Sequence, residues 1–489
     1  MIGVEAANIV GSQHATAHCH STSGPLTREG EMSESVNIAR MTERHTTTRL
    51  AGVALVATLT LSACGATAQT PAATTTAAPS LVIDTSTPLG AINDRILQWI
   101  NGETAPDPAA VDAITGPELA TAVEPLGGLL TPLEQVRAGA PNLATGFVAG
   151  PAGGVLEFTT GGIPATISTS IGTDGTLDGF LVGPDTPQIS SFDDLDAALS
   201  KVAPHYSFSA SRLSDGDCEA VYSTDADVLL PLSSVFELYV LGALTDEIRA
   251  GTVEWDEQLT VRDANKSAPS GELHGLPDGT AVSVREAAEK MISLSDNTAT
   301  DLLMARLGRE RVERQLRVMG HHDPAVMTPM MDTRQFFVIG FGDPNLRSEW
   351  ADADPAVREE LLARADARPL EIDLENFLDD PASADGVEWY ANAQDVCAAM
   401  GYLASGPAAQ ENRRILALTP GVQLDPASWP YSGFKGGSAP GDLAGAYLAT
   451  DAAGQDWIVT EQFQADEAIG SIATSYAALV AQESFALLR

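Results

Sequence analysis

The spacing of apolar residues differs between the two halves of the chain. Residues 81–200 begin with a helical face of aliphatic side chains at spacings of three and four: Leu89, Ile92, Ile96 and Ile100. A weaker helical stretch follows. Residues 146–182 then carry short β-rich runs with turn signals at Gly153-Gly154, Gly161-Gly162 and Asp174-Gly175. Helices followed by antiparallel strands predict a small α+β domain.

The second half has strands at both of its ends. We expect β runs at 206–213 and 219–222, an apolar helix near 234–250, helical segments over 283–320 and 355–405, and strands near 432–435, 445–450 and 457–461. A last helix has one apolar face: Ile469, Ile472, Tyr476, Leu479 and Val480. This order predicts one sheet that is closed by the N- and C-terminal strands and packed on a helical region.

The one long apolar run, residues 50–61, is too short to span a bilayer, which needs about 20 residues. Basic residues precede it and small residues follow it, as in a secretory signal. The run ends in Leu61-Ser62-Ala63-Cys64-Gly65, which resembles a lipobox, where the Cys thiol is acylated. Acyl chains on Cys64 would hold the protein on the outer face of the cell membrane.

These patterns predict five parts. They are a mis-assigned start (1–40), a lipoprotein signal peptide (41–63), an Ala/Thr/Pro-rich tether (64–80), the small α+β domain (81–200) and the second domain (201–489).

Charge and cysteine content narrow the possible partners. The chain has 27 Lys and Arg against 66 Asp and Glu, a net charge of −39, so we expect no nucleic-acid binding. Cys218 and Cys397 would share an oxidising compartment and could pair. However, Cys397 lies at helical spacing with Met400 and Val396, so we predict a buried free thiol.

Three clusters in the second domain suggest serine acyl transfer. Leu232-Ser233-Ser234-Val235-Phe236-Glu237 begins an apolar helix, Ser295-Asp296-Asn297 follows a helix, and Lys435-Gly436-Gly437-Ser438 follows a strand. A serine hydroxyl needs an adjacent base to become a nucleophile. At a helix N-terminus it also gains N–H groups that stabilise an oxyanion.

In order and spacing these clusters resemble those of class A β-lactamases and related penicillin-binding proteins, whose signatures are S-x-x-K, S-D-N and K-T/S-G. The resemblance covers residues 205–489, and SDNTATDLLMARLG from Ser295 is its most specific part. It implies a β-lactamase/transpeptidase-like domain. The whole lipoprotein also resembles the actinobacterial group related to a clavulanate-cluster β-lactamase-like protein, in which a small α+β domain comes first. Residues 81–200 would suit a small cone-shaped fold like that of the steroid-isomerase/polyketide-cyclase group.

The resemblance also implies roles for individual residues. Ser234 would be the nucleophile, and its N–H and that of Ser438 would form the oxyanion hole beside Gly437. Ser295 would relay a proton to the leaving nitrogen, and Asn297 would bind the substrate amide. Lys435 would attract the substrate carboxylate and polarise Ser295, with Asp296 structural. No cofactor or metal is implied.

Two positions depart from the family pattern. Glu237 stands where S-x-x-K has lysine, and a reversed charge there is costly beside a developing oxyanion. Glu237 could pair with Lys435, take up a proton, or act as the base itself. Gly436 stands where the family has Thr or Ser, whose hydroxyl contacts the substrate carboxylate. The hydroxyl of Ser438, two residues later, would compensate for its loss only in part.

Class A hydrolysis also needs a glutamate that activates the deacylating water. Glu371 partly resembles that residue of the family's E-x-x-L-N motif, but Asn376 is displaced by one position. We interpret Glu371 chiefly as an exposed carboxylate.

The sequence thus favours slow acyl transfer through Ser234 to a β-lactam, an ester or a peptidoglycan-type amide. The alternative is a catalytically inactive cell-wall-binding or sensing lipoprotein. Glu237 favours the alternative, whereas the intact Ser-Asp-Asn cluster and Lys435 favour the enzyme.

Overall fold

The computed structural model describes residues 81–488 except 152, 268 and 373–379. The predicted signal peptide, Cys64 and the tether lie outside the described residues, and their assignment stays a prediction. Among the described residues, no helix is both long and apolar enough to cross a membrane.

The first part of the described chain is helical and then β, as predicted. Its helices are α1 (Pro88–Ile100), α2 (Pro108–Asp112), α3 (Pro117–Val123) and α4 (Leu130–Ala138). Helix α1 begins where Thr87 accepts a hydrogen bond from the Gly90 N–H, and it buries Ile96 and Ile100 completely. The strands β1 (Leu143–Ala149), β2 (Gly153–Thr160), β3 (Ile163–Ile171) and β4 (Leu177–Pro184) form one antiparallel sheet in chain order.

Two of the three predicted turns are confirmed, and one is wrong. Gly161, Gly162 and Gly175 have positive φ between paired strands. Gly153 and Gly154, in contrast, begin strand β2. A Cβ on Gly154 would lie 2.9 Å from the Phe147 ring, so this glycine permits a close approach instead of a turn. The likeness to the steroid-isomerase cone stays a prediction.

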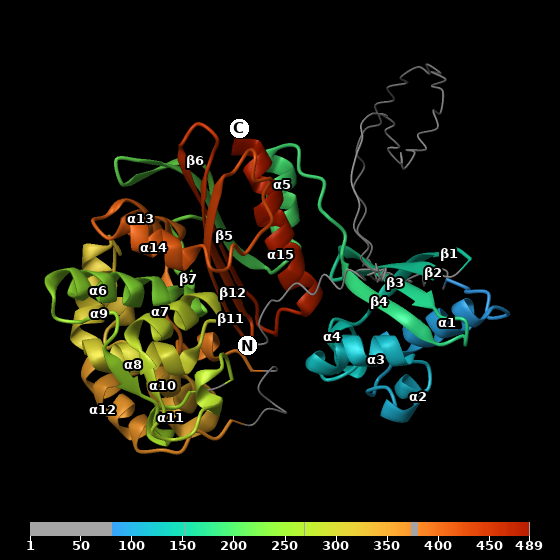
Figure 1. Cartoon of the computed structure of the whole chain (residues 1–489), viewed down its shortest axis with the longest axis horizontal. Helices are drawn as coiled ribbons and strands as arrows, with labels where there is room; N and C mark the ends of the chain where they lie inside the picture. The colour runs from blue at the N-terminus through green and yellow to red at the C-terminus, as the bar shows by residue number, and fades with distance from the viewer. Residues whose placement is uncertain (1–80, 152, 268, 373–379, 489) are drawn as a thin grey trace, which may run out of the picture. The chain divides into compact units, whose positions relative to one another are not determined.

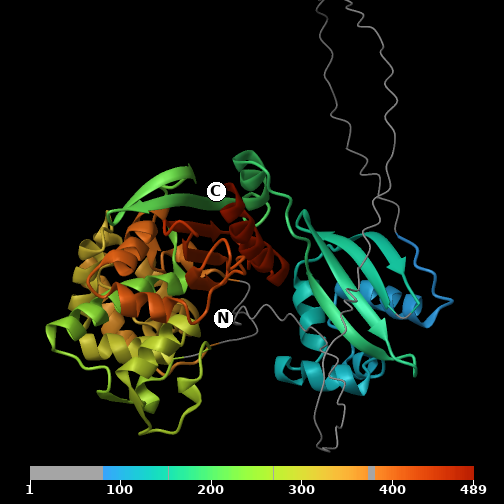
Figure 2. The same cartoon turned by 45° about the horizontal axis from the view of Figure 1, so that its top comes forward.

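A five-stranded antiparallel sheet organises the rest of the chain (Figures 1 and 2). Its strands are β5 (His205–Ser214), β6 (Asp217–Thr224), β11 (Tyr431–Ala439), β12 (Asp442–Thr450) and β13 (Asp456–Gln464). Their order is β11-β12-β13-β5-β6. The first strands therefore pair with the last, and the predicted closure of one sheet by both ends of the segment is confirmed.

Helices cover both faces of this sheet (Figure 1). One face packs on α5 (Phe192–Leu199) and α15 (Ser471–Ser484). The other face packs on the helical region, whose helices are α6 (Glu237–Ala250), α7 (Val284–Ser293), α8 (Asn297–Leu307), α9 (Arg309–Val318), α10 (Thr333–Phe337), α11 (Pro344–Ala351), α12 (Pro355–Asp366), α13 (Ala393–Ser405) and α14 (Ala409–Leu416). Two short strands, β8 (Gln258–Thr260) and β9 (Ala281–Ser283), pair within it.

The helical stretch predicted over 355–405 is interrupted. Helix α12 ends at Asp366 and α13 begins at Ala393, with Pro369 and Pro381 between them, because proline cannot continue a helix. Strand β10 (Tyr390–Ala391) lies in this interval and pairs with β7 (Leu230–Pro231). This pair leads the chain into Ser233 and Ser234.

The free-thiol prediction for Cys397 is wrong. Cys397 is buried on α13 and forms a disulfide with Cys218 on β6, 179 residues earlier in the chain. The helical spacing correctly indicated a buried face. It could not indicate that this face packs on the β5–β6 hairpin, where Cys218 lies.

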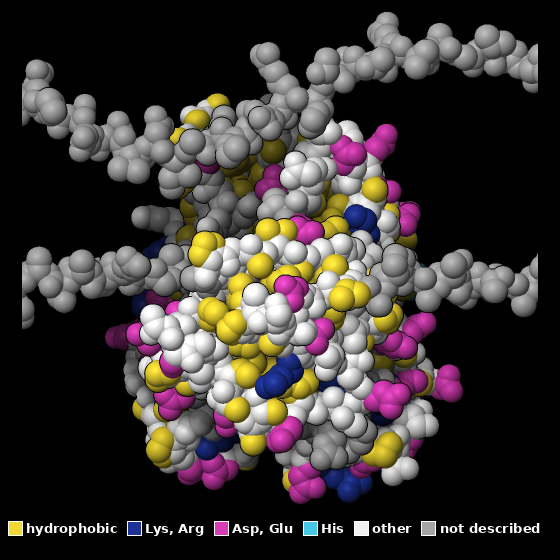
Figure 3. Space-filling view, turned by 90° about the vertical axis from the view of Figure 1, so that its right-hand side faces the viewer, with side chains coloured by type: hydrophobic (Ala, Val, Ile, Leu, Met, Phe, Trp, Pro, Cys, Tyr) yellow, Lys and Arg dark blue, Asp and Glu magenta, His cyan; other side chains and the backbone are white. Residues whose placement is uncertain are grey.

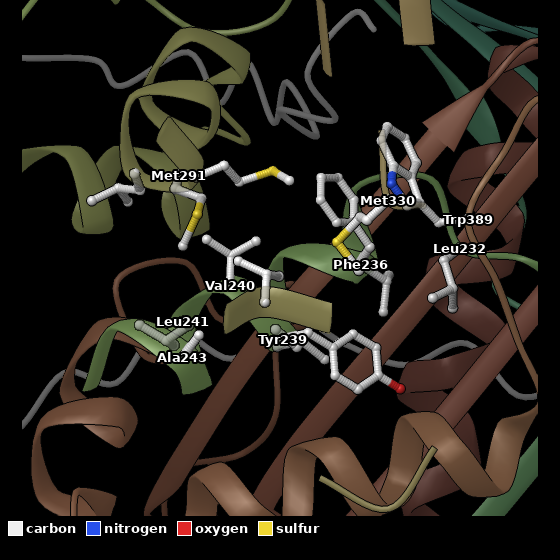
Figure 4. Packing of buried hydrophobic residues seen from close by; sticks show 14 of the residues in the cluster. Leu232, Phe236, Tyr239, Val240, Leu241, Ala243, Met291, Met330 and Trp389 are labelled. Carbon is white, nitrogen blue, oxygen red and sulfur yellow. The ribbon is translucent and has the colours of Figure 1, made fainter. Parts of the chain in front are cut away.

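The helical region has an aromatic and aliphatic core beneath the start of α6. Figure 4 shows Phe236 beside Trp389 and Met330. The rings of Phe236 and Trp389 stack with centroids 4.0 Å apart. On the surface shown in Figure 3, acidic side chains are widely spread and basic ones are few, in keeping with the net charge of −39.

Candidate active site

The chain is constrained immediately before the predicted nucleophile. A 3₁₀ turn, η2 (Ser233–Phe236), precedes α6, and both Ser233 and Ser234 are buried. Ser233 has a φ of +45°, which is uncommon for a residue with a side chain. Its hydroxyl lies 3.4 Å from Glu388 Oε2, and Glu388 Oε1 accepts the Trp389 N–H at 2.7 Å. Glu388 thus holds the turn from which Ser234 is presented.

Strand β11 lies directly against this turn. A Cβ on Gly437 would lie 2.6 Å from the Ser234 amide nitrogen and 2.4 Å from the Leu232 carbonyl oxygen, so only glycine fits there. Ser234 and Ser438 line the same pocket. Their placement suits the oxyanion hole that the family resemblance implies, because backbone N–H groups must converge on one point to stabilise an oxyanion.

The Ser295 loop is held by Asp296. Ser295 lies between α7 and α8 with a φ of +51°. Asp296 caps α8 by accepting the Ala299 N–H at 2.9 Å, and its second oxygen accepts the N–H groups of Glu272 and Leu273 at 2.7 and 2.9 Å. These bonds give Asp296 the structural part expected for it.

Ser295, Lys435 and Glu237 form one buried polar cluster. Lys435 Nζ donates to Ser295 Oγ at 2.7 Å and to the Gly436 carbonyl at 2.7 Å. It also lies 3.2 Å from Glu237 Oε2, and the two side chains are 1% and 0% exposed. Thr300 Oγ1 lies 3.1 Å from Glu237 Oε1. Of the three outcomes considered for Glu237, the structure shows pairing with Lys435.

Burial shifts both members of this ion pair toward their neutral forms. It raises the pKa of Glu237 to about 7, against the opposing influence of Lys435 and Thr300. It lowers the pKa of Lys435, which the Glu237 carboxylate opposes. Glu237 is therefore a weaker acid than an exposed glutamate.

A small pocket opens beside Ser234, with about 230 Å³ of empty space that includes open solvent. The residues that line it are Ser233, Ser234, Asn297, Thr333, Phe336, Phe337, Trp389, Ser438 and Ala439. Asn297 is 1% exposed, and its Nδ2 has no hydrogen-bond partner among the described residues. A buried amide without a partner is costly, so this donor suits a substrate carbonyl.

Glu371 is exposed and has no contact with this pocket among the described residues. Asn376, the other half of its motif, lies outside the described residues. Glu371 is therefore an exposed carboxylate, as the sequence predicted.

Sequence reasoning did not anticipate the aromatic wall formed by Phe336, Phe337 and Trp389, because no motif marks these residues. It also missed Glu388 and Asp442. Burial, with the charge of Asp442, raises the pKa of Glu388 well above its ordinary value, and burial raises the pKa of Asp442 to about 7. Both carboxyl groups therefore favour their neutral forms more than exposed acids do.

One group of possible metal ligands occurs among the described residues. Side-chain atoms of His321, His322 and Asp395 lie within 4.8 Å of one another. These atoms already have partners: His322 Nδ1 lies 2.7 Å from Asp395 Oδ2, and His321 Nε2 lies 2.9 Å from the Tyr390 carbonyl oxygen. None of the three lines the pocket beside Ser234, so this group is not part of the candidate site.

Residues 191–364 match the family model described as the β-lactamase enzyme family. This segment contains Ser234, Glu237, Ser295 and Asn297, whereas Lys435 lies beyond it. The match supports a mixed α/β, β-lactamase-like fold for this part of the chain. No curated protein matches the chain in sequence.

Solved structures of low sequence identity are also similar. A β-lactamase from Sphaerobacter thermophilus is 18% identical with a TM-score of 0.43, covering 61% of this chain and 97% of that one. The protein PBP-A is 16% identical with a TM-score of 0.40, covering 60% and 96%. A β-lactamase from Chitinophaga pinensis is 15% identical with a TM-score of 0.44, covering 61% and 99%.

Proposed function

We propose that this chain is a serine hydrolase of the β-lactamase type that transfers an acyl group to Ser234, with Glu237 as general base in place of the lysine of S-x-x-K. The observation that carries the proposal is the buried cluster of Ser295, Lys435 and Glu237 beside the turn that presents Ser234. Glu237 follows Ser234 by three residues, and side chains at this spacing lie next to each other on a helix.

The proposed reaction begins when the Ser234 hydroxyl attacks a substrate carbonyl carbon and loses its proton to Glu237. The N–H groups of Ser234 and Ser438 stabilise the resulting oxyanion. The carbon–oxygen or carbon–nitrogen bond then breaks, and the leaving group takes the proton of the Ser295 hydroxyl. Lys435, 2.7 Å from Ser295 Oγ, returns a proton to Ser295 and regains its own from the protonated Glu237, which is again a carboxylate. The product of this half-reaction is an ester between the acyl group and Ser234.

Deacylation is proposed to be slow. The residues that line the pocket include no Asp or Glu among those described, and three are aromatic. Water that attacks the Ser234 ester therefore has no pocket carboxylate to activate it, and Glu237 must act a second time.

Intact-mass spectrometry after incubation with a penicillin and with an activated ester tests this proposal. We expect an adduct on the native protein, none on Ser234→Ala, and a strong loss with Glu237→Gln. An adduct that survives in Ser234→Ala would overturn the assignment of the nucleophile.

The second candidate is a catalytically inactive wall-binding lipoprotein, which the ion pair between Glu237 and Lys435 favours because it ties up both groups. Glu237→Lys separates the two functions. If Glu237 is a disabling substitution, Glu237→Lys should label faster than the native protein. If no form is labelled, including Glu237→Lys, the binding function stands.

The proposal also covers how the protein is attached to the membrane and which group of lipoproteins it is related to. We propose that lipidated Cys64 attaches the protein to the outer face of the membrane. We also propose that residues 81–200 form a cone-shaped, steroid-isomerase-like domain, and that the chain is related to the actinobacterial clavulanate-cluster group, in which a small α+β domain comes first. The support is the lipobox-like sequence at Cys64 and the helices followed by a four-stranded sheet. The disulfide between Cys218 and Cys397 suits an oxidising compartment outside the cytoplasm.

A further inference from the structure

We infer that the pocket beside Ser234 takes an uncharged acyl donor, such as a neutral ester with an apolar acyl group, and discriminates against substrates that carry a carboxylate. This inference rests on the proposed acyl transfer through Ser234. Three features of the site carry it: the contacts of Lys435, the ring over Gly436 and the lining of the pocket.

Lys435 is occupied by the protein itself. Its ammonium donates hydrogen bonds to Ser295 Oγ and the Gly436 carbonyl, and its charge is balanced by Glu237 Oε2 at 3.2 Å. The side chain is 1% exposed. A substrate carboxylate would have to displace one of these partners and would then lie close to the charge of Glu237, which repels it.

The second feature is the ring of Phe434, which covers the position where the family pattern has a hydroxyl. Phe434, Gly436 and Ser438 lie on one face of β11, because side chains alternate along a strand. A Cβ on Gly436 would lie 2.5 Å from the tip of the Phe434 ring. The ring packs on Tyr447 with centroids 4.8 Å apart. A hydroxyl-bearing residue therefore does not fit at 436 unless Phe434 moves.

The third feature is the lining itself. Of the described residues that form the pocket, none is Lys, Arg or His. Phe336 and Trp389 pack together at 5.0 Å, and the Trp389 indole N–H donates to the Met331 carbonyl, so the ring turns only apolar atoms to the pocket. Asn297 Nδ2, which has no hydrogen-bond partner among the described residues, can donate to a substrate carbonyl oxygen. A carboxylate placed here would lose its hydration without gaining a cationic partner.

Two matched pairs of probes test the inference. The first pair is p-nitrophenyl butanoate and the p-nitrophenyl monoester of succinic acid, whose acyl chains differ in a terminal carboxylate. The second pair is benzylpenicillin and its methyl ester. Second-order rate constants for labelling of Ser234 are measured by intact-mass spectrometry, with Ser234→Ala as the blank.

We expect the neutral member of each pair to label at least about tenfold faster, because the anionic member finds no free cation. Equal rates, or faster labelling by the anionic members, would overturn the inference while leaving acyl transfer intact. Labelling by none of the four probes would instead overturn the proposed function.

Two variants test the cause. Glu237→Gln removes the competing carboxylate, so the ratio of anionic to neutral rates should rise even where both rates fall. The double variant Phe434→Ala/Gly436→Ser restores space and a hydroxyl, and its ratio should exceed that of Phe434→Ala alone. If neither variant changes the ratio, Lys435 and Gly436 do not set the preference.

Discussion

Glu237 is the residue at which this site differs most from the class A pattern, because it replaces the lysine of S-x-x-K. Its carboxylate is completely buried and lies 3.2 Å from the Lys435 ammonium, and burial raises its pKa to about 7. As a base it must be deprotonated, so acylation should accelerate as pH rises through about 7 and level off above it. Labelling rates of Ser234 measured across that range check this prediction.

The control is Thr300→Val. The Thr300 hydroxyl lies 3.1 Å from Glu237 and lowers its pKa, so its removal should move the midpoint of the rate profile to higher pH. A profile without a midpoint near neutral pH, or one unchanged by Thr300→Val, would remove Glu237 from the role of base.

Glu461 gives a separate prediction for stability. It is buried on β13, and Tyr447 donates to it at 2.9 Å, while its other oxygen has no partner among the described residues. Burial raises the pKa of Glu461 from 4.5 to about 8. The folded protein therefore binds this proton more tightly than the unfolded chain, and the free energy of unfolding should fall as pH rises between these two values.

Glu461→Gln removes this titration. The free energy of unfolding of the variant relative to the native protein should rise with pH by on the order of a few kcal/mol and level off above about pH 8. Urea unfolding of both proteins at about pH 5, 7 and 9 measures it. The other buried acids contribute equally to both curves, so parallel curves would show that Glu461 is not the titrating group.

The sequence predicted which residues to examine but not how their side chains meet. The order of Ser234, Ser295 and Lys435 pointed to one site, and the 2.7 Å contact between Ser295 and Lys435 brings two of them together. Their catalytic roles stay predictions. The cover over Gly436 was missed, although Phe434 stands two residues earlier, because a strand pattern gives the face of a side chain and not its rotamer.

Among the elements, β11 and the turn before α6 depend most closely on each other. Gly437 lets the strand backbone touch the Ser234 amide. Gly437→Ala should push β11 away from this turn and reduce labelling of Ser234 by about a hundredfold or more, since one misplaced oxyanion donor costs that much. Gly183→Ala on β4 is the matched control, because a Cβ there meets nothing within 4 Å. Equal labelling by the two variants would contradict the role of this contact.

Element types and the pairing of the end strands in one sheet followed from the pattern and order of the elements, whereas the side-chain partner of Cys397 did not. The apolar face of α1 and the strands at both ends of the second segment are where the pattern placed them. The disulfide shows the limit: Cys397 was correctly assigned to a helical face, but the strand opposite it lies 179 residues away. Local spacing carries no information about contacts at such a separation.

At the scale of the whole molecule, the proposed acylation of Cys64 would decide where the candidate site is located. If it is acylated as proposed, Cys64→Ala should move the protein from the membrane fraction to the soluble fraction of fractionated cells. Ser62→Ala, which keeps the cysteine, is the control and should remain with the membrane. Retention of Cys64→Ala on membranes to the same extent would refute the lipid anchor.

The strand order has a consequence for the time at which activity can arise. Strand β5 lies between β13 and β6, so the sheet is incomplete until the last strands have been synthesised. Ser234 leaves the ribosome about two hundred residues before Lys435, which completes its polar cluster. Pairing between such distant segments is slow compared with local helix formation. A chain exported while it is being made would thus cross the membrane without its sheet, and the proposed acylating site would assemble only on the far side.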